Sequence, residues 1–531
     1  MTPEPDYTHR SRTAVFALIA ALILLSFVPP QTVGGIRLKR ANILSEFLRF
    51  EEEEETRSEE AILTALDEEE FRIDLQQVAR LIADSAPREV PATYEWSLVE
   101  REPAPAAHRA LPGDTARRLP ELIPIEDFDT TGHSRLAALC RKLQRGDSLV
   151  RIAVMGDSFI EGDILTSDLR EQLQLRYGGA GAGFAPAASP LTDFRRTIRT
   201  RSKGWNSYNV MQRRTTPEAL ADSYCVSGWV CQPADGASTR WEGTSERACL
   251  DSCNTARILF LSRSDSRVEV TVNDAQSRIF EIEASPLMRQ IVVRGTIRSL
   301  EFSVLSGAAG VVGYGALFES SPGVAVDNYS IRSNNGQAMF RTSPALNAQA
   351  DRMLGYDLVI LQYGLNILQP DVRNYTRYGE QIEKMIAYVR HCFPRAAVLV
   401  MSVSDRSIKE EDRFVPMASA PFMVEAQRAA AEASGAAFWN TYRAMQSLGG
   451  MERFVAEGWA GKDYTHINFA GGRRIAWGLC DAIDDAVRRH PLSVRVAHAN
   501  IADSARITPL EEALIRSARP VGRNLRNHPE R

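Results

Sequence analysis

The sequence predicts an α/β protein: a parallel sheet covered by helices on both faces, interrupted by an antiparallel β-sandwich and preceded by a membrane anchor. Three observations lead to this prediction. Buried strand patterns alternate with helical patterns on either side of residues 190–320. Within that range the pattern changes to short alternating segments about ten residues apart. Near the N-terminus lies one long apolar run.

The apolar run covers residues 14–28, AVFALIAALILLSFV, and Ser26 is its one polar residue. At ~1.5 Å per residue a helix of this length reaches about 22 Å, short of the ~30 Å hydrocarbon core unless flanking residues contribute. A signal-peptide core and a buried core helix are the alternatives. Because the following VPPQTVGG contains no small-x-small cleavage site, we predict an uncleaved anchor at the inner membrane with a periplasmic, extracytoplasmic body.

Between the anchor and the body the composition predicts a tether. Residues 41–84 are acidic and favour a helix, with apolar residues between 75 and 82 spaced to form one packing face. Residues 87–124 are rich in proline and lack a sustained period, which predicts a linker. We therefore divide the chain into an anchor at 1–30, a stalk and linker at 31–129, an α/β domain at 130–190 and 321–490, an inserted module at 191–320, and a loosely ordered tail at 491–531.

Within the α/β domain, strand and helix patterns follow one another along the chain. The expected strands lie at 149–155, 357–363, 396–403 and 436–439, and the expected helices at 164–177, 377–391, 421–434 and 469–489. The inserted module has alternating segments at 268–274, 278–284, 289–295 and 297–306. Their spacing is typical of an antiparallel sandwich.

Overall composition excludes two function classes. Lys and Arg number 63 against 67 Asp and Glu, a net charge of −4, so the basic excess of a nucleic-acid binder is missing. Hydrophobic residues at 44% and charged residues at 24% are ordinary for a globular protein. Since only one stretch is apolar enough for a membrane, a polytopic transporter is excluded as well.

Four of the seven cysteines, Cys225, Cys231, Cys249 and Cys253, lie close together in the insertion. In an exported protein such neighbours predict at least one disulfide, although spacing does not give the pairing. Zinc is the competing interpretation. The intervals are not CxxC and no histidine falls between 134 and 390, so we expect no metal site.

Two motifs supply candidates for nucleophilic chemistry. Ser158 lies in GDSFIEGD, directly where the first predicted strand ends, and ligands of open α/β sheets bind at carboxyl ends of strands. A serine needs a base, and His466 in DYTHINFAGG is the well-placed histidine, with Asp463 three residues ahead of it. A simple turn and a coincidental surface DxxH are the alternative interpretations of these motifs.

Two further strand ends carry candidate hydrogen-bond donors. Asn366 in QYGLN follows the strand at 357–363, where its amide can donate to a developing oxyanion. The segment DNYSIRSNNG at 327–336 can present a backbone N–H, and our alignment places Ser333 in that role. Each is also an ordinary loop residue when taken alone.

Taken together, these pieces resemble the SGNH, or GDSL-type, esterase and acyltransferase superfamily. The matching motifs are GDSF at 156–159, SIRSNNG at 330–336, YGLN at 363–366 and DYTH at 463–466. The β-rich interruption resembles the peptidoglycan O-acetyl esterases, in which a carbohydrate-binding-like module splits the hydrolase. The resemblance implies a doubly wound, flavodoxin-like sheet.

The resemblance also implies a role for each site residue. Ser158 would be the nucleophile, His466 the base and Asp463 its orienting acid. The backbone N–H groups of Ser158 and Ser333, with the amide of Asn366, would form the oxyanion hole. Two positions depart from the family pattern: Ser333 stands where a glycine is usual, and Ile367 stands where an aspartate usually follows the asparagine.

The resulting prediction is a serine esterase that removes O-acyl groups, most simply acetyl, from a cell-envelope polysaccharide such as peptidoglycan, with no cofactor. One alternative is an O-acetyltransferase that passes acetyl from the same serine to a glycan hydroxyl and works with a membrane acyl-transfer partner. Another is a glycan-binding scaffold with a vestigial site. Trp205, Trp229 and Trp241 in the insertion either stack on sugar rings or pack in the core.

Overall fold

The computed structural model describes residues 72–84, 92–98, 119–190 and 194–491, together with two short paired strands, β1 (Thr32–Val33) and β2 (Ile36–Arg37). Those two strands belong to a compact unit at residues 1–57, and all other described residues belong to a second unit. The predicted anchor at 14–28 and nearly all of the predicted tail lie outside the described residues. None of the described helices combines the length and hydropathy needed to cross a membrane.

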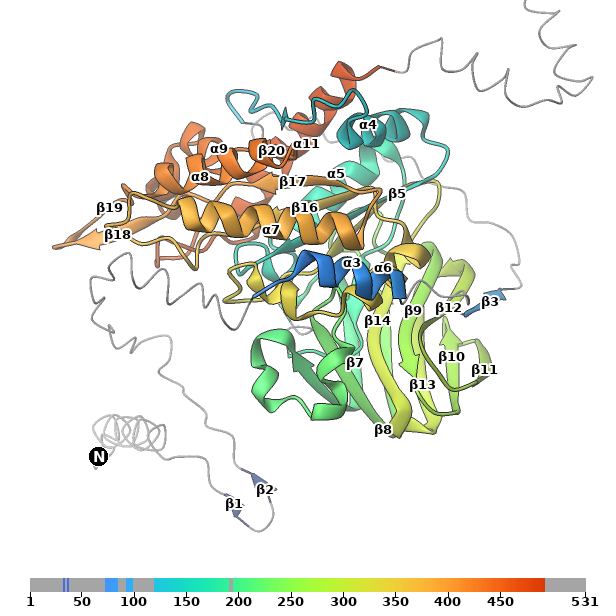
Figure 1. Ribbon diagram of the computed structural model, residues 1–531. Helices are drawn as coiled ribbons and strands as arrows, with labels where there is room; N and C mark the ends of the chain where they lie inside the picture. Colours follow the sequence, from blue (N-terminus) through green and yellow to red (C-terminus); the bar gives the residue numbers. More distant parts are fainter. Residues whose placement is uncertain are drawn as a thin grey trace, which may run out of the picture. The chain divides into compact units, whose positions relative to one another are not determined.

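A six-stranded sheet forms the centre of the α/β domain (Figure 1). Its strands, in order across the sheet, are β15 (Gly323–Asn328), β5 (Leu149–Gly156), β16 (Leu358–Gln362), β17 (Ala397–Met401), β20 (Ala437–Trp439) and β4 (Glu126–Asp127). The first five run parallel, and β4 is antiparallel to β20. Numbered along the chain, the parallel strands have the order 2-1-3-4-5, which is that of flavodoxin-like sheets. The predicted parallel sheet is confirmed.

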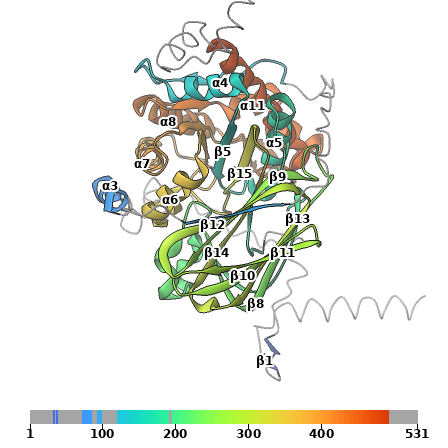
Figure 2. The same ribbon diagram turned by 90° about the vertical axis from the view of Figure 1, so that its right-hand side faces the viewer.

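Helices cover both faces of this sheet (Figures 1 and 2). One layer contains α4 (Arg135–Arg145), α5 (Thr166–Tyr177) and α11 (Phe469–Arg489), and the other contains α6 (Pro344–Leu354), α7 (Thr376–Cys392) and α8 (Ala420–Ala433). Two short helices, α9 (Thr441–Ser447) and α10 (Gly450–Ala456), follow β20. Because both faces are covered, every residue of β16 and β17 is buried.

Ten further strands form a second sheet, called the β-module here. They are β3 (Thr93–Ser97), β6 (Gly183–Pro186), β7 (Ile198–Asn209), β8 (Trp229–Gly243), β9 (Cys253–Ser262), β10 (Ser266–Val272), β11 (Gln276–Ile282), β12 (Ser285–Ile297), β13 (Ser299–Ser306) and β14 (Val311–Glu319). The long strand β8 pairs with β14 at Cys231 and with β13 near Trp241. The sheet therefore folds over a core that includes Trp241, Phe260 and Phe302, as a sandwich does.

The predicted linker contains ordered structure. Strand β3 at 93–97 pairs in parallel with β12 and completes one edge of the β-module. Upstream, α3 (Leu75–Asp84) packs against α6 and α7 and buries Val78, so the predicted packing face is in place. Tyr94 and Trp96 alternate with polar residues as an edge strand requires, but five residues are a short signal inside a proline-rich segment.

The prediction of a disulfide among the four clustered cysteines is wrong. Cys225, Cys231 and Cys253 are buried free thiols. Cys231 donates to the Ala188 carbonyl and Cys253 to that of Thr255, at 3.2 and 3.3 Å. Burial raises the pKa of Cys225 to about 11 and that of the other two to about 12. In the described residues no group of His, Cys, Asp and Glu side chains is arranged to hold a metal ion.

Candidate active site

Three neighbouring strands deliver the predicted site segments to one edge of the parallel sheet. Gly156 at the end of β5 pairs with Gln362 at the end of β16. On the other side of β5, the segment after β15 stays alongside, since the Ile331 N–H donates to the Gly156 carbonyl at 2.9 Å. A Cβ on Gly156 would lie 2.7 Å from the Gln362 carbonyl oxygen, so this close approach requires glycine. The loops that carry Ser158, Ser333 and Asn366 therefore leave the sheet together.

Ser158 lies in a nearly buried turn, with 7% of its surface exposed. The preceding Asp157 is fully buried and accepts a hydrogen bond from the Phe159 N–H at 2.9 Å. A short 3₁₀ turn, η2 (Glu161–Asp163), lies between the serine and α5, so the field of the α5 N-terminus does not act directly on the hydroxyl.

His466 and Asp463 lie in the loop before α11, and the aspartate organises that loop. Asp463 Oδ1 accepts the backbone N–H groups of Thr465 and His466, both at 3.1 Å. Its other oxygen lies 2.8 Å from His466 Nδ1. Tyr464 between them has a φ of +53°, and the tight reversal turns the imidazole back over the carboxylate.

The structure joins Ser158, His466 and Asp463 in one chain of hydrogen bonds. Ser158 Oγ lies 3.0 Å from His466 Nε2. Burial raises the pKa of Asp463, but hydrogen bonds from His466 and the backbone outweigh it and hold that pKa below its ordinary value. An ionised carboxylate only accepts, so Nδ1 of His466 carries the proton and Nε2 presents its lone pair to the serine.

Two glycines let α11 bring this loop to the serine. A Cβ on Gly472 would overlap the Ile164 carbonyl oxygen, and one on Gly471 would overlap that of Trp459. The first turn of α11 thus packs directly against the backbone that follows Ser158. Asn468 caps the helix by accepting from the N–H groups of Ala470 and Gly471. The GG pair within the sequence motif therefore has a structural reason.

A hairpin that the sequence did not predict contacts the histidine loop. It consists of β18 (Ser407–Glu410) and β19 (Arg413–Pro416). The Phe414 ring stacks on Tyr464 with centroids 3.7 Å apart, and the Ser407 N–H donates to the Tyr464 carbonyl at 3.0 Å. Apolar Ile408, Phe414 and Val415 around a charged turn were the available signal, which is weak for strands this short.

Asn366 lies between the loops that carry the other two candidates. Its Nδ2 atom lies 3.0 Å from the Asn334 carbonyl and 3.3 Å from Asp157 Oδ2. Burial raises the pKa of Asp157 to about 7. Ser333 is exposed and has a φ of +60°, a conformation that glycine adopts most easily.

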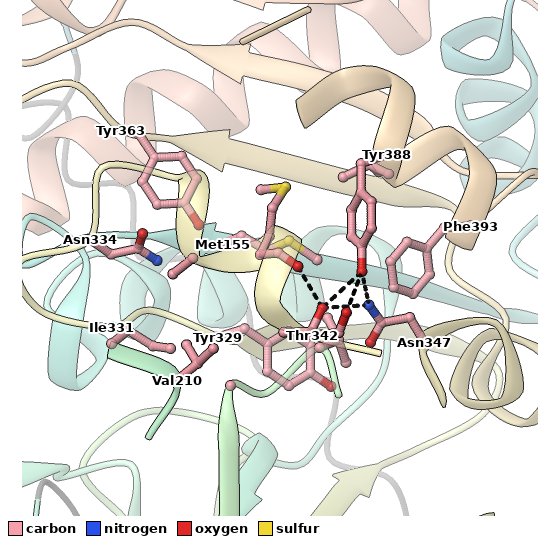
Figure 3. Close-up of a pocket in the computed structure, with 15 residues that line it drawn as sticks. Met155, Val210, Tyr329, Ile331, Asn334, Thr342, Asn347, Tyr363, Tyr388 and Phe393 are labelled. Atoms are coloured by element: carbon pink, nitrogen blue, oxygen red, sulfur yellow. Dashed lines mark hydrogen bonds between the residues drawn. The ribbon is translucent and has the colours of Figure 1, made fainter. Parts of the chain in front are cut away.

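A hollow lies on the inner side of the same segment, with about 420 Å³ between its walls when the open solvent at its mouth is included (Figure 3). Its walls include Met155, Ile331 and Asn334, and they are mostly apolar and aromatic. At one end Asn347 Nδ2 donates to the hydroxyl of Tyr388 at 3.1 Å, within a small polar cluster. Asn334, whose carbonyl accepts from the Asn366 amide, is one of the residues that line the hollow.

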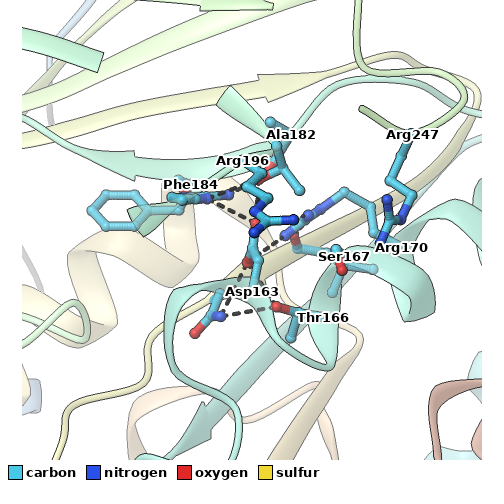
Figure 4. Close-up of polar contacts among 12 residues, drawn as sticks. Asp163, Thr166, Ser167, Arg170, Ala182, Phe184, Arg196 and Arg247 are labelled. Atoms are coloured by element: carbon cyan, nitrogen blue, oxygen red, sulfur yellow. Dashed lines mark hydrogen bonds and ion pairs between the residues drawn. The ribbon is translucent and has the colours of Figure 1, made fainter. Parts of the chain in front are cut away.

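A buried charge network fixes the backbone that follows Ser158 (Figure 4). Asp163 is fully buried and has a φ of +69°. Its carboxylate forms ion pairs with Arg170 at 3.2 Å and with Arg195 at 2.8 Å. Asn328 Nδ2 donates to it at 3.0 Å. Burial raises the pKa of Asp163, but the two arginines outweigh burial and lower it. The sequence analysis missed this network, because its members are far apart along the chain.

The geometry defines an α/β domain with a Ser–His–Asp chain at the carboxyl edge of its sheet and a β-module inserted within it. No family model and no curated protein matches the chain. A solved structure of a peptidoglycan O-acetylesterase matches 69% of this chain and 99% of its own, with a TM-score of 0.56 and 20% identity. The resemblance predicted from the sequence is thereby confirmed at the level of the fold.

Two more distant matches are also esterases or lipases. A family two carbohydrate esterase from Cellvibrio japonicus matches 58% of this chain and 99% of its own, with 9% identity and a TM-score of 0.24. A GDSL-like lipase from Parabacteroides merdae matches 30% and 73%, with 14% identity and a TM-score of 0.24. At these TM-scores the two add nothing to the assignment of the fold.

Proposed function

We propose that this protein is a serine esterase that removes O-acyl groups, acetyl in the simplest case, from a cell-envelope polysaccharide. The observation that supports it most is a pair of hydrogen bonds on His466. Its Nε2 lies 3.0 Å from Ser158 Oγ, and its Nδ1 lies 2.8 Å from the Asp463 carboxylate. A vestigial scaffold would not need to keep all three groups in hydrogen-bonding register. The fold shared with a peptidoglycan O-acetylesterase supports a glycan as substrate.

In the first half-reaction Ser158 Oγ attacks the ester carbonyl while His466 Nε2 takes its proton. Asp463 stabilises the imidazolium that forms. Negative charge develops on the former carbonyl oxygen, and the N–H groups of Ser158 and Ser333 and the amide of Asn366 are the donors that would bind it. The intermediate then collapses: the carbon–oxygen bond to the sugar breaks, and His466 gives its proton to the departing sugar oxygen.

In the second half-reaction water attacks the acyl-serine, with His466 again as the base. The acyl group leaves as the free acid and Ser158 regains its proton. The exposed position of His466, whose side chain is 46% accessible, gives water a route to the acyl-enzyme. We further propose that the apolar segment 14–28 anchors the protein outside the cytoplasm, where such a polysaccharide lies.

The test is acetate release from O-acetylated peptidoglycan by the full-length protein. Wild type should release acetate, and Ser158→Ala should not. The matched control is Ser148→Ala, because Ser148 immediately precedes β5 at the opposite edge of the sheet. Release by Ser158→Ala at the wild-type rate would show that the serine is not the nucleophile. Transfer of acetyl to an added glycan hydroxyl, without free acetate, would establish a transferase instead.

A further inference from the structure

A second cavity lies where the β-module meets the loops of the proposed active site. Its walls come from η2, the segment after β15, and strands β6 to β8, and the space between them is about 530 Å³ when the open solvent at its mouth is included. Gly162 in its wall is four residues beyond Ser158, and Ser330 is three residues before Ser333. The cavity therefore shares both loops with the proposed site, although none of the Ser158, His466 and Asp463 side chains lines it.

Three polar side chains in the cavity wall have no hydrogen-bond partner within the described chain. They are the Thr200 hydroxyl, the Trp229 indole N–H and the Ser330 hydroxyl. Thr200 and Trp229 are more than nine-tenths buried, with 8% and 7% exposed. None of the three polar atoms is shut away from solvent, so each is open to the cavity and can bind a polar group of a ligand that enters it.

Three other polar side chains of the wall, Asp163, Arg195 and Asn328, already have hydrogen-bond partners within the protein. Arg195 Nε donates to Asp163 at 2.8 Å, and its Nη2 donates to the Ala182 carbonyl at 2.7 Å. Asn328, a neutral member of the wall, donates its Nδ2 protons to Asp163 and to the Thr166 hydroxyl. Within the wall the one carboxylate, Asp163, is paired with the one guanidinium, Arg195, so the groups left to a ligand are neutral donors and acceptors on a rigid frame. Such a lining fits an uncharged, hydroxyl-bearing ligand better than a phosphate or a metal ion.

Trp229 differs from the other two tryptophans considered as sugar contacts. Trp241 is completely buried and its indole N–H donates to the Pro186 carbonyl at 3.1 Å. Trp205 stacks on Phe302 inside the β-module. Trp229 alone of the three lines the cavity beside the proposed site. An indole provides both a flat apolar face and one donor, the combination that a pyranose ring can use.

We propose that this cavity is a saccharide subsite, which binds a sugar ring adjacent to the one whose ester group reaches Ser158. The proposal rests on the proposed function, because it names the second contact point of the same glycan. It gives the inserted module a role in substrate selection: β7 supplies Thr200, β8 supplies Trp229, and the hydrolase loop supplies Ser330.

The first test is binding of O-acetylated peptidoglycan glycan fragments to the full-length Ser158→Ala protein. Adding Thr200→Val, Trp229→Phe and Ser330→Ala together removes the three polar groups and nearly conserves volume. At several-fold per hydrogen bond, the combined variant should raise Kd about 30–100-fold. The control, Trp96→Phe, lies at the β3 edge of the module and should bind like the parent. A combined variant that binds within twofold of the parent overturns the proposal.

The second test uses the same three substitutions in the active protein. The ratio of kcat/KM for the glycan to kcat/KM for p-nitrophenyl acetate should fall about tenfold or more. Equal losses on both esters would mean that the three groups only support the fold, and would overturn the subsite. Failure of the proposed function looks different. In that case wild type releases no acetate at all, while the fragments still bind Ser158→Ala and the three substitutions still weaken that binding.

Discussion

The two sides of the proposed site are held in different ways. On the proton-transfer side, Ser158, His466 and Asp463 already make the hydrogen bonds that the reaction uses. On the oxyanion side, the Asn366 amide donates to the Asn334 carbonyl and lies 3.3 Å from Asp157, so both of its protons have partners before any substrate arrives. The first side is ready to react, whereas the second must exchange a protein contact for the oxyanion.

This difference follows from how each side is built. The loop before α11 is fixed by its own backbone, by the Asp463 carboxylate and by the close packing at Gly472. The oxyanion side is assembled from three separate loops, and Ser333 among them is exposed. A preorganised donor contributes most when it has no other partner to lose. Substitutions on the two sides should therefore differ in size and in kind.

The largest effect is expected from the proton-transfer side. His466→Ala should lower kcat by about 10⁵–10⁶-fold, and the double variant with Ser158→Ala should be no slower, because the two residues act as one unit. Acetate release under single-turnover conditions measures this. His391→Ala at the end of α7 is the control and should retain full turnover. Losses that multiply in the double variant would contradict the relay.

A smaller effect is expected from the oxyanion side. Asn366→Ala should lower kcat about 10²–10³-fold with little change in KM, the usual cost of one oxyanion donor. Asn374→Ala is a suitable control, because its side-chain oxygen accepts only from Thr376 at the start of α7. If Asn366→Ala changed KM and left kcat intact, the amide would bind the substrate in its ground state and not the transition state.

For the candidate site, the sequence predicted the elements that carry the residues better than the contacts between them. Ser158, Asn366 and His466 were picked out because strand ends and a local DxxH motif are short-range features. The chain of bonds from Asp463 through His466 to Ser158 joins loops more than 300 residues apart, so spacing alone could not show it.

Two features were out of reach for a similar reason. The parallel strand β3 depends on pairing with β12, whose partner residues lie 197 positions later. The buried network around Asp163 needs Arg195 and Asn328 from two other segments. The cysteine prediction failed because proximity in sequence is a poor guide to proximity of thiols: Cys225 packs on the α/β side and Cys231 inside the β-module. The strand, the charge network and the positions of the thiols all depend on contacts between residues far apart in the sequence.

The packing at Gly472 offers a way to disturb the proton-transfer side alone. Gly472→Ala would push the first turn of α11 away from the Ile164 carbonyl and withdraw His466 from Ser158. A displacement near 1 Å can cost about 10²-fold in rate, so kcat should fall by roughly 10–100-fold. Gly458→Ala, whose Cβ meets nothing within 4 Å although its φ is +69°, controls for the loss of a glycine near the loop. A normal kcat with an unchanged fold would show that the loop does not need this contact.

The smallest effect on turnover, and the most informative about the oxyanion side, is expected from Asp157→Asn. The asparagine keeps an oxygen for the Phe159 N–H but turns an NH₂ group toward Asn366, so kcat should fall about 3–10-fold.

The stability of Asp157→Asn should depend on pH in a different way from that of the wild type. The folded-state pKa of Asp157, about 7 against an ordinary 3.8, is raised, so the stability that this carboxyl contributes is present below about pH 4 and is lost as pH rises through 7. Asp157→Asn removes that loss. Its free energy of unfolding relative to wild type should therefore increase from pH 4 to pH 8, by at most about 4 kcal/mol. Denaturant unfolding across this pH range measures the difference, and Asp147→Asn, at a carboxylate whose side chain is 61% exposed, should follow the wild-type curve. Parallel curves for wild type and Asp157→Asn would mean that Asp157 stays ionised when folded and binds the Asn366 amide as a charged acceptor at every pH in the range.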